Sequence, residues 1–396
     1  MVDAAEIFDA GTTRTNQRSA AAGRLLTFDA ATRAVYAAFC RGKLHSTPQK
    51  PAFVEAWAGE DDAQIFAVEL GQIGQPTAMI VLEAVKDGAT TIARYPGGRH
   101  ANGSFSAFAA QSTSDLRGAL RETISQARPD IDLLLLERNE HTRDGYTHPL
   151  YAEGSPQSPN VALAVDLSGG FDAVLERSSG KRKRKKYRSQ TRKFEAAGGH
   201  RRCAATTPEE VDRLLAAFYE MKAERFRQMG VTDVFAPAAV KRSFRRMFVG
   251  ALGDARPEFI LHGLEVGGVL RAVTGSSISG RRLTCEFSAF ADDELSGASP
   301  GDFLFFENIR EACEMGLDIY DFGVGDELYK RQWCDIETKH FDFHLPLTSR
   351  GHAVSAINRM SGAVKRTIKE NQLVWSLLKR ARKSRAASGP ASETPD

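Results

Sequence analysis

The chain has 396 residues, of which 42% are hydrophobic and 26% charged, values typical of a globular protein long enough for two domains of ordinary size. Its 53 Lys and Arg residues nearly balance 50 Asp and Glu residues, so the formal net charge is only +3. A nucleic-acid-binding protein usually carries a domain-wide basic excess. We therefore expect no nucleic-acid partner.

The five cysteines are widely spaced and show no metal-binding pattern such as CxxC. They indicate a reducing compartment and favour neither a disulfide framework nor a zinc site. The N-terminal sequence lacks the apolar core of a signal peptide, and no apolar run approaches the roughly 20 residues that span a bilayer. These features predict a cytoplasmic protein without a metal, and they leave open attachment to the inner face of the plasma membrane.

The elements expected along the chain follow one plan twice. In the first half, two β-prone runs at residues 65–70 and 76–85 predict a hairpin, and an amphipathic helix and a buried strand follow within residues 114–137. In the second half, residues 259–266 and 269–279 flank Gly267-Gly268, and a helix at 303–315 precedes a strand at 318–322. The two series are offset by roughly 190 residues, which predicts an architectural repeat.

We therefore expect an α/β fold (α+β, with mixed sheets) made of two similar units at residues 24–170 and 171–350. Residues 1–23 and 384–396 are predicted to be a disordered lead-in and tail. Residues 351–383 predict a basic amphipathic helix. Its apolar stripe either packs on the protein or binds an anionic membrane surface; it comprises Ile357, Met360, Val364, Ile368, Trp375 and Leu378.

Six basic residues stand side by side at residues 181–186, within SSGKRKRKKYRSQTRKFEAAGG. A Ser cap before them and Gly198-Gly199 after them predict a helix between. Helical spacing then places Lys181, Arg184 and Arg188 on one face. That face either is solvated or contacts the phosphates of a ligand or a membrane.

The sequence Ser299-Pro300-Gly301-Asp302 stands where a helix is expected to begin. The unpaired N–H groups and the dipole at a helix start favour an anion, and a phosphate is the natural ligand. The alternative is that Ser299 or Asp302 merely caps the helix.

These features together resemble GNAT-superfamily N-acyltransferases, in particular the duplicated branch with the CelD-type exopolysaccharide proteins and the FemABX peptidoglycan aminoacyl transferases. The resemblance rests on the basic helix, on the SPG at Ser299–Gly301 and on DFGVGDELYKRQW at Asp321–Trp333, and it covers about residues 45–345. It implies two tandem GNAT-like domains that form a pseudo-duplicated monomer, with acetyl-CoA or acyl-CoA as co-substrate. The usual GNAT phosphate signature, (Q/R)xxGx(G/A), is absent, so an acyl carrier protein or an aminoacyl-tRNA is an alternative donor.

The resemblance also implies roles for individual residues. The donor would lie between two splayed strands, with its pyrophosphate at the helix start. Donor binding is assigned to Phe287, Ser288, Ala289, Ser299, Pro300, Gly301, Asp302, Arg184 and Arg188. Chemistry is assigned to Glu286 as base, Tyr329 as the acid for the thiolate, Asp326 and Lys330 on acceptor and oxyanion, and Asp321 of the same motif. Acceptor binding is assigned to His100 and Asn102.

Each assignment has a structural alternative. Glu286 could lie on a solvated strand face, Tyr329 could be a half-buried aromatic, and an Asp–Lys pair could lock the turn at residues 321–330. A lone histidine is more often structural than functional.

Three functions fit these expectations. The first is acyl-CoA-dependent N-acyl transfer, in particular N-acetylation, to an amino sugar in exopolysaccharide synthesis. The second transfers the acyl group to a long-chain amine such as a sphingoid base, and the third is an inactive regulator that binds a nucleotide second messenger. A lipid acceptor predicts a wide apolar groove between the repeats, whereas a sugar predicts a polar one with stacking aromatics.

Overall fold

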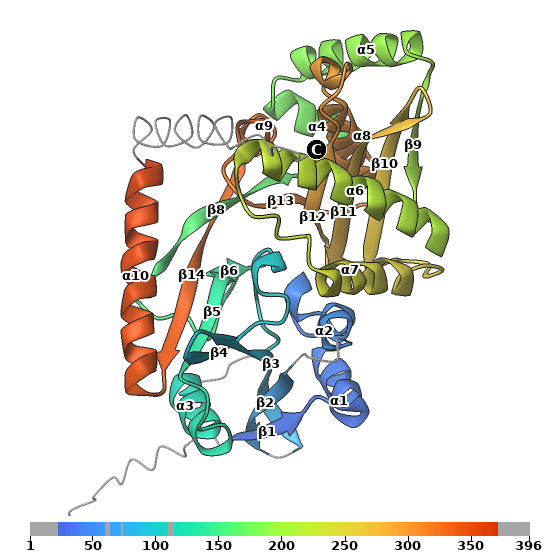
Figure 1. The fold of residues 1–396 in the computed structure, drawn as a ribbon. Helices are drawn as coiled ribbons and strands as arrows, with labels where there is room; N and C mark the ends of the chain where they lie inside the picture. Colours follow the sequence, from blue (N-terminus) through green and yellow to red (C-terminus); the bar gives the residue numbers. More distant parts are fainter. Residues whose placement is uncertain (1–22, 60–63, 73, 110–114, 371–396) are drawn as a thin grey trace, which may run out of the picture.

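The computed structural model describes residues 23–59, 64–72, 74–109 and 115–370, and a twelve-stranded mixed sheet runs through them (Figure 1). Its strand order is β1-β2-β3-β4-β5-β14-β8-β13-β12-β11-β10-β9. The first half supplies β1 (Gly23–Thr27), β2 (Ile65–Gln72), β3 (Gln75–Asp87), β4 (Thr90–Arg94) and β5 (Leu133–Glu140). The second half supplies β9 (His200–Ala204), β10 (Phe259–Val266), β11 (Val269–Ser279), β12 (Arg282–Phe290) and β13 (Ile319–Val324).

The order of elements confirms the predicted repeat. Strands β1 to β5 correspond in sequence order and sheet position to β9 to β13. The helices correspond in the same way: α1 (Ala30–Cys40), α2 (Pro51–Ala58) and α3 (Leu116–Ala127) match α6 (Pro208–Met229), α7 (Ala238–Gly250) and α8 (Pro300–Glu314). Helix α8 begins three residues before the predicted start because Pro300 occupies its first turn, where a missing N–H costs nothing.

The two halves exchange their last strands. Strand β8 (Gln157–Asp166) follows β5 in the chain but pairs with β13 of the second half, and β14 (Ile336–Pro346) follows β13 but pairs with β5 of the first. The two exchanged strands also pair with each other, antiparallel. Backbone hydrogen bonds therefore run without interruption from one half to the other. The predicted boundary at residue 170 assigns β8 to the first unit of the chain. In the sheet, however, β8 pairs with β13 of the second half.

Helices cover both faces of each half. In the first half α3 packs on the residues of β2 that alternate with those under α1 and α2, as expected for a strand with period two. In the second half α6 and α7 share a core with Phe287 and Ala289 of β12, while α4 (Gly170–Arg177), α5 (Gly180–Ala196) and α8 lie over the opposite face. Helix α2 of the first half contributes Trp57 to the core of α6 and α7, so the halves also share apolar contacts.

The two basic helices expected from the sequence are present. Helix α5 ends at Ala196, followed by Gly198 and Gly199, both with positive φ, and the Gly199 N–H bonds to the Phe194 carbonyl. Ser179 stands at its start but makes no side-chain cap. Helix α10 (Ser349–Glu370) crosses strands β5, β14 and β8, and the predicted continuation to residue 383 lies outside the described residues, as do residues 1–22 and the tail 384–396. Among the described helices, none combines the length and apolarity needed to cross a bilayer.

Candidate functional site

Strands β12 and β13 separate partway along their length. They pair in parallel only from Arg282 to Thr284 of β12, opposite Ile319 to Asp321. Next to this point β12 has a bulge, since Gly275 of β11 faces Phe287 and Ser276 faces Cys285, which leaves Glu286 without a register partner. Past the bulge, β12 has no strand partner among the described residues on the side of β13, and an unpaired strand edge of this kind can bind an extended ligand like an added strand.

A cavity of about 580 Å³ lies at the far end of this gap. Its walls come from the end of β12, the start of α8, helix α6, helix α5 and α9 (Leu328–Arg331). Apolar side chains dominate one part of the lining, and polar groups gather at the start of α8. The lining includes Met221, Phe290, Ser299, Gly301, Asp302, Phe305, Leu328 and Tyr329.

The start of α8 has no side-chain cap, so the capping alternative fails for Ser299 and Asp302. Ser299 has a left-handed backbone with φ of 58°, and the Asp302 carboxylate instead forms an ion pair with Lys186, 2.9 Å away. A Cβ at Gly301 would lie 2.9 Å from the Phe290 ring, so only glycine lets α8 approach the end of β12 this closely. The positive end of the helix dipole therefore faces the cavity.

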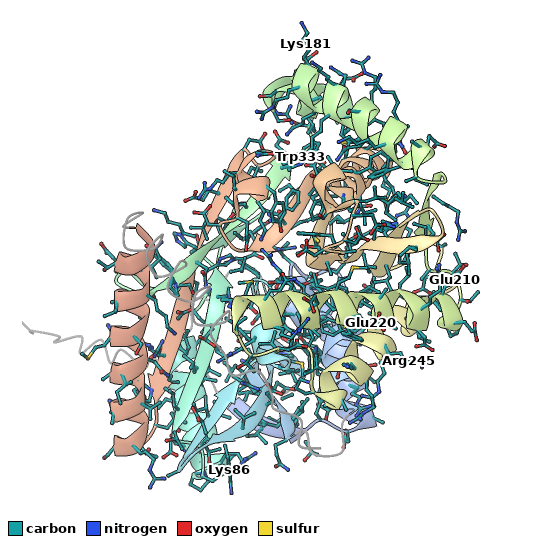
Figure 2. The ribbon with its side chains drawn as sticks, turned by 45° about the horizontal axis from the view of Figure 1, so that its top comes forward. Lys86, Lys181, Glu210, Glu220, Arg245 and Trp333 are labelled. Carbon is teal, nitrogen blue, oxygen red and sulfur yellow. The ribbon has the colours of Figure 1, made fainter. Side chains whose placement is uncertain are left out.

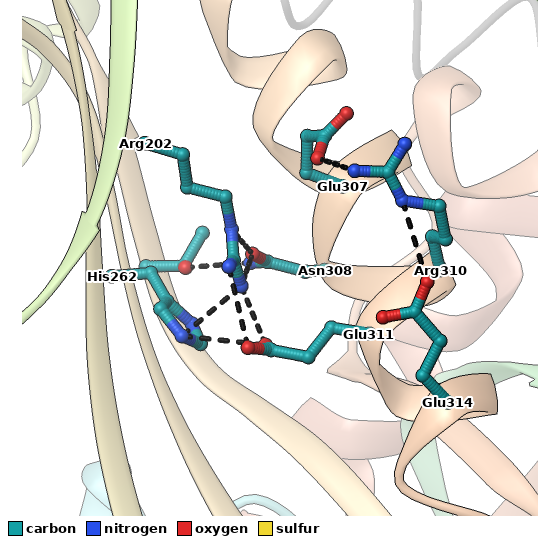
Figure 3. A network of polar contacts seen from close by, with 8 residues as sticks. Arg202, His262, Glu307, Asn308, Arg310, Glu311 and Glu314 are labelled. Atoms are coloured by element: carbon teal, nitrogen blue, oxygen red, sulfur yellow. Dashed lines mark hydrogen bonds and ion pairs between the residues drawn. The ribbon is translucent and has the colours of Figure 1, made fainter.

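A polar network holds α8 against the sheet (Figure 3). Arg202 of β9 donates to Asn308 at 3.0 Å and to Glu311 at 2.5 Å, and the Asn308 amide donates to Thr274 of β11 at 2.8 Å. His262 of β10 lies 3.3 Å from Glu311. These bonds join one face of α8 to the three strands β9, β10 and β11, and they hold the helix on the sheet.

Helix α5 packs on α8 through a face other than its Lys181–Arg184–Arg188 stripe. Tyr187 stacks on Phe303 and Phe306, and the Gln190 amide donates to the carbonyls of Ala298 and Ser299. This packing turns the predicted stripe outward. Arg184 pairs with exposed Asp172, Arg188 is exposed, and Figure 2 shows Lys181 projecting away from the protein.

The α5 cations that do face the start of α8 are Arg182, Lys183 and Lys186, which with Trp333 line a second cavity of about 210 Å³. Lys183 is only 8% exposed; its ammonium donates to the Gln332 carbonyl at 2.7 Å and lies 3.9 Å from the centre of the Trp333 ring. Burial lowers the pKa of Lys183 to about 8, so it is still mainly charged at neutral pH. The second cavity shares Lys186 and Asp302 with the first, which places these cations beside the α8 N-terminus.

Glu286 is half-buried at the β12 bulge, where the two halves meet. Ser277 of β11 donates to one carboxylate oxygen at 2.5 Å, and Asn102 of the first half donates to the other at 3.2 Å and to the Glu286 carbonyl at 2.8 Å. Burial raises the pKa of Glu286 to about 7, although these hydrogen bonds oppose the shift. A carboxyl that titrates near neutral pH can accept a proton from an amine. The alternative that Glu286 lies on a solvated strand face is therefore wrong.

Tyr329 lies on the opposite wall of the gap, in the lining of the large cavity. Its ring stacks on Phe305 of α8, with the ring centres 5.5 Å apart. Burial raises the pKa of Tyr329 far above its ordinary value, and a hydrogen bond with Ser288 of β12 only partly offsets this. The hydroxyl therefore keeps its proton across the working pH range.

The other motif residues hold the turn between β13 and α9. Asp321 accepts from Arg282 at 2.8 Å and from the Gly323 N–H at 2.7 Å. Lys330 donates to the Val324 carbonyl at 3.2 Å and pairs with Glu327 at 3.0 Å, while exposed Asp326 pairs with Arg331. The pair that locks this turn is thus Glu327 with Lys330, in place of the expected Asp–Lys pair.

The two predicted acceptor residues have different surroundings. His100 stacks on Trp57 and lies against Phe235 and Phe244, and burial lowers its pKa to about 4. It serves as an aromatic contact between the halves. Asn102, two residues later, reaches Glu286.

Sequence reasoning missed several residues around the gap. Ser277 and Thr47, whose hydroxyls are 2.6 Å apart, support Glu286 from two elements that are distant in the chain. Sequence reasoning also missed Lys222 of α6, whose pKa is lowered by burial. Only the regular spacing of Met221, Glu224, Arg225 and Gln228 on α6 could have indicated a lining face.

The acidic groups at the cavity have cationic or amide partners. Asp293 pairs with Arg271, Glu224 with Arg227, and Gln228 donates to Asp292 at 3.1 Å. These partners reduce the repulsion that an anionic ligand would meet. In the described part of the chain, no cluster of three or more His, Cys, Asp or Glu side chains is arranged to bind a metal.

Comparison with known proteins agrees with this geometry. Residues 181–331 match the family described as acetyltransferase (GNAT) domain. Among solved structures, the chain is similar to FemX, with 11% identity and a TM-score of 0.55 over 85% of this chain and 100% of that one. It is also similar to the C-terminal domain (DUF2156) of a putative lysylphosphatidylglycerol synthetase from Agrobacterium fabrum, with 12% identity and a TM-score of 0.51 over 83% of this chain and 95% of that one. No curated protein matches the sequence.

The family match falls entirely within the second half of the chain. The whole chain has a mixed α/β fold of the FemX-like, duplicated kind, as expected from the sequence.

Proposed function

We propose that the protein is an acyl-CoA-dependent N-acyltransferase whose donor site is the gap between β12 and β13 and the cavity beyond it. The observation that carries this proposal is the separation of the two strands beside an uncapped α8 N-terminus. A thioester with a phosphorylated, extended arm fits that combination, because the arm can pair with β12 while its phosphates meet the helix dipole.

The phosphates would bind at Ser299, Pro300, Gly301 and Asp302, and Lys186 and Lys183 supply positive charge beside them. The backbone of Phe287, Ser288 and Ala289 would hold the pantetheine arm. Arg184 and Arg188 lie on the outer face of α5 and have no part in this proposal.

Glu286 and Tyr329 would carry the proton transfers. Glu286 takes a proton from the ammonium form of the acceptor, and the neutral nitrogen then forms a bond to the thioester carbonyl carbon. Backbone N–H groups of β12 stabilise the negative oxygen that develops. The carbon–sulfur bond breaks, the leaving thiolate takes a proton from Tyr329, and Tyr329 regains a proton from the attacking nitrogen, which becomes the amide nitrogen. The products are an amide and a free thiol.

The acceptor would enter from the side of the first half, where Asn102 meets Glu286. The surroundings there are polar, with Ser277, Thr47 and the buried Glu140–Arg143 ion pair. Aromatic rings, including Trp57, lie close to the same segment. This environment supports a hydroxyl-rich amine, in particular an amino sugar of cell-surface polysaccharide synthesis as in CelD-type proteins, over a long-chain amine such as a sphingoid base.

The test measures free thiol released from acetyl-CoA and from a long-chain acyl-CoA, with glucosamine-type and sphinganine-type amines. Amine-dependent thiol release with the sugar amine is the expected result. Release only with sphinganine would move the acceptor to the lipid class. Binding of acyl-CoA without turnover of any amine would favour the regulatory alternative, and no binding of either donor would remove the proposal.

A further inference from the structure

Helix α10 exposes three large apolar side chains along one line. Ile357, Met360 and Val364 are 61%, 70% and 58% exposed, and their spacing of three and four residues places them on one helical face. We call these three residues the outer stripe. In Figure 1 the helix lies along the edge of the molecule beside β14 and β8.

The opposite face of α10 packs on the sheet with small and polar residues. Gly351 is buried, and a Cβ there would lie 1.8 Å from the Asp132 carbonyl oxygen. Ser355 is buried and its hydroxyl lies 3.1 Å from His344 Nδ1. A surface helix ordinarily buries its apolar side and exposes its polar side, and α10 does the reverse. The alternative that this stripe packs on the protein is therefore wrong for Ile357, Met360 and Val364.

The charged residues of α10 are all basic except its last residue, Glu370. From Ser349 to Lys369 the sequence contains no Asp or Glu, and it contains Arg350, Arg359, Lys365, Arg366 and Lys369. Arg350, Arg359 and Lys365 are exposed. An exposed apolar line among cations is complementary to a surface that is anionic outside and apolar beneath.

We propose that α10 is a membrane-docking element and that the outer stripe enters the interface of an anionic bilayer. A second copy of the chain fits the same face less well. A stable protein interface uses about 20–30 residues on each side, whereas the outer stripe offers three on a convex helix. A bilayer requires no matching shape, and apolar side chains flanked by cations give the weak, reversible binding of a peripheral protein. This proposal does not depend on the acyltransferase function.

The test is co-sedimentation of the full chain with vesicles of phosphatidylglycerol and phosphatidylcholine in equal parts, compared with vesicles of phosphatidylcholine alone. We expect binding to the anionic vesicles and at least about tenfold weaker binding to the neutral ones. The variant I357S/M360S/V364S should lose at least about tenfold in affinity for the anionic vesicles, and R359E/K365E should also bind more weakly, because it removes attraction to the lipid headgroups.

A matched control is V35S/M229S/V269S, which removes three other exposed apolar side chains from different faces. It should bind vesicles like the parent chain. All substituted positions are exposed, and unchanged thermal unfolding would verify that the variants fold. The proposal is overturned if the parent chain ignores anionic vesicles, or if the outer-stripe variant binds them as the parent does. It is also overturned if sedimentation velocity shows a dimer that this variant abolishes while vesicle binding persists.

Discussion

The two halves share an order of elements but differ at one helix start and at the strand before it. In the first half, Asp115 caps α3 by accepting from the Gly118 N–H at 2.9 Å. In the second half, the corresponding start of α8 has no side-chain cap and opens on the large cavity. The Asp115 carboxylate bonds an N–H group at the start of α3, whereas Asp302 in the first turn of α8 pairs with Lys186 and caps no N–H group, so that start can accept an anion from a ligand. This difference supports the proposal that the donor binds in the second half.

The strands that precede these two helices also differ between the halves. Strand β12 continues to Phe290 along the gap, whereas β4 ends at Arg94. The chain after β4 turns toward the other half instead, and it brings Asn102 to Glu286. The second half thus contains the proposed donor site, and the first half supplies Asn102 beside the proposed base.

The largest expected effect comes from removing the proposed base. Glu286→Gln should lower kcat/KM by about 10²–10⁴, the usual contribution of general acid–base catalysis. Its dissociation constant for acyl-CoA should change little. The matched control is Glu83→Gln in the first half, because burial raises the pKa of that carboxyl too, but it pairs with Arg94. Equal loss of activity in both variants would contradict the difference between the halves.

The pH dependence should follow Glu286. Its pKa of about 7 predicts that kcat/KM rises roughly tenfold per pH unit below 7 and levels off above it, since the base must be ionised. The free energy of unfolding should instead decrease as the pH rises. The folded state holds this proton up to about pH 7 and the unfolded state only to about 4.5, so the free energy of unfolding should fall between these values by on the order of 3 kcal/mol. Glu286→Gln should flatten both profiles; an unchanged slope would exclude Glu286 as the titrating group.

The two faces of α5 should respond differently to charge reversal. Lys186→Glu with Lys183→Gln should weaken acetyl-CoA binding by about tenfold or more, because both cations lie beside the α8 N-terminus. Arg184→Glu with Arg188→Glu should change it less than about threefold, since these side chains are exposed to solvent. Calorimetric titration measures both. A larger loss of affinity in the Arg184/Arg188 variant than in the Lys183/Lys186 variant would support donor binding by Arg184 and Arg188.

The smallest effect concerns the capped helix. Asp115→Ala should destabilise the protein by about 1 kcal/mol, the usual loss for a helix cap, and leave acetyl-CoA affinity unchanged. Thermal unfolding and the same titration check this. A change in affinity would mean that the start of α3 also takes part in donor binding.

Local sequence patterns predicted many of the helices, strands and turns of this protein. Alternating apolar runs and the Gly267-Gly268 turn gave both hairpins, and the glycines after Ala197 gave the end of α5. Glu286, Tyr329 and the SPG segment could be proposed from the sequence because they lie in or near the motifs that carry the family resemblance. The sequence left open whether the Lys181–Arg184–Arg188 face of α5 is solvated or contacts phosphates, and the structure places it in solvent. The aromatic residue Tyr187 and the amide of Gln190 decided the packing.

The sequence by itself determined the elements, the repeat and the residues nearest the helix start, since each depends on neighbours within a few positions. Only the tertiary structure decided the exchange of β8 and β14, the meeting of Asn102 with Glu286 and the outward apolar face of α10. These features depend on contacts between residues far apart in the chain. No periodicity along a single segment can encode which distant segment it will meet.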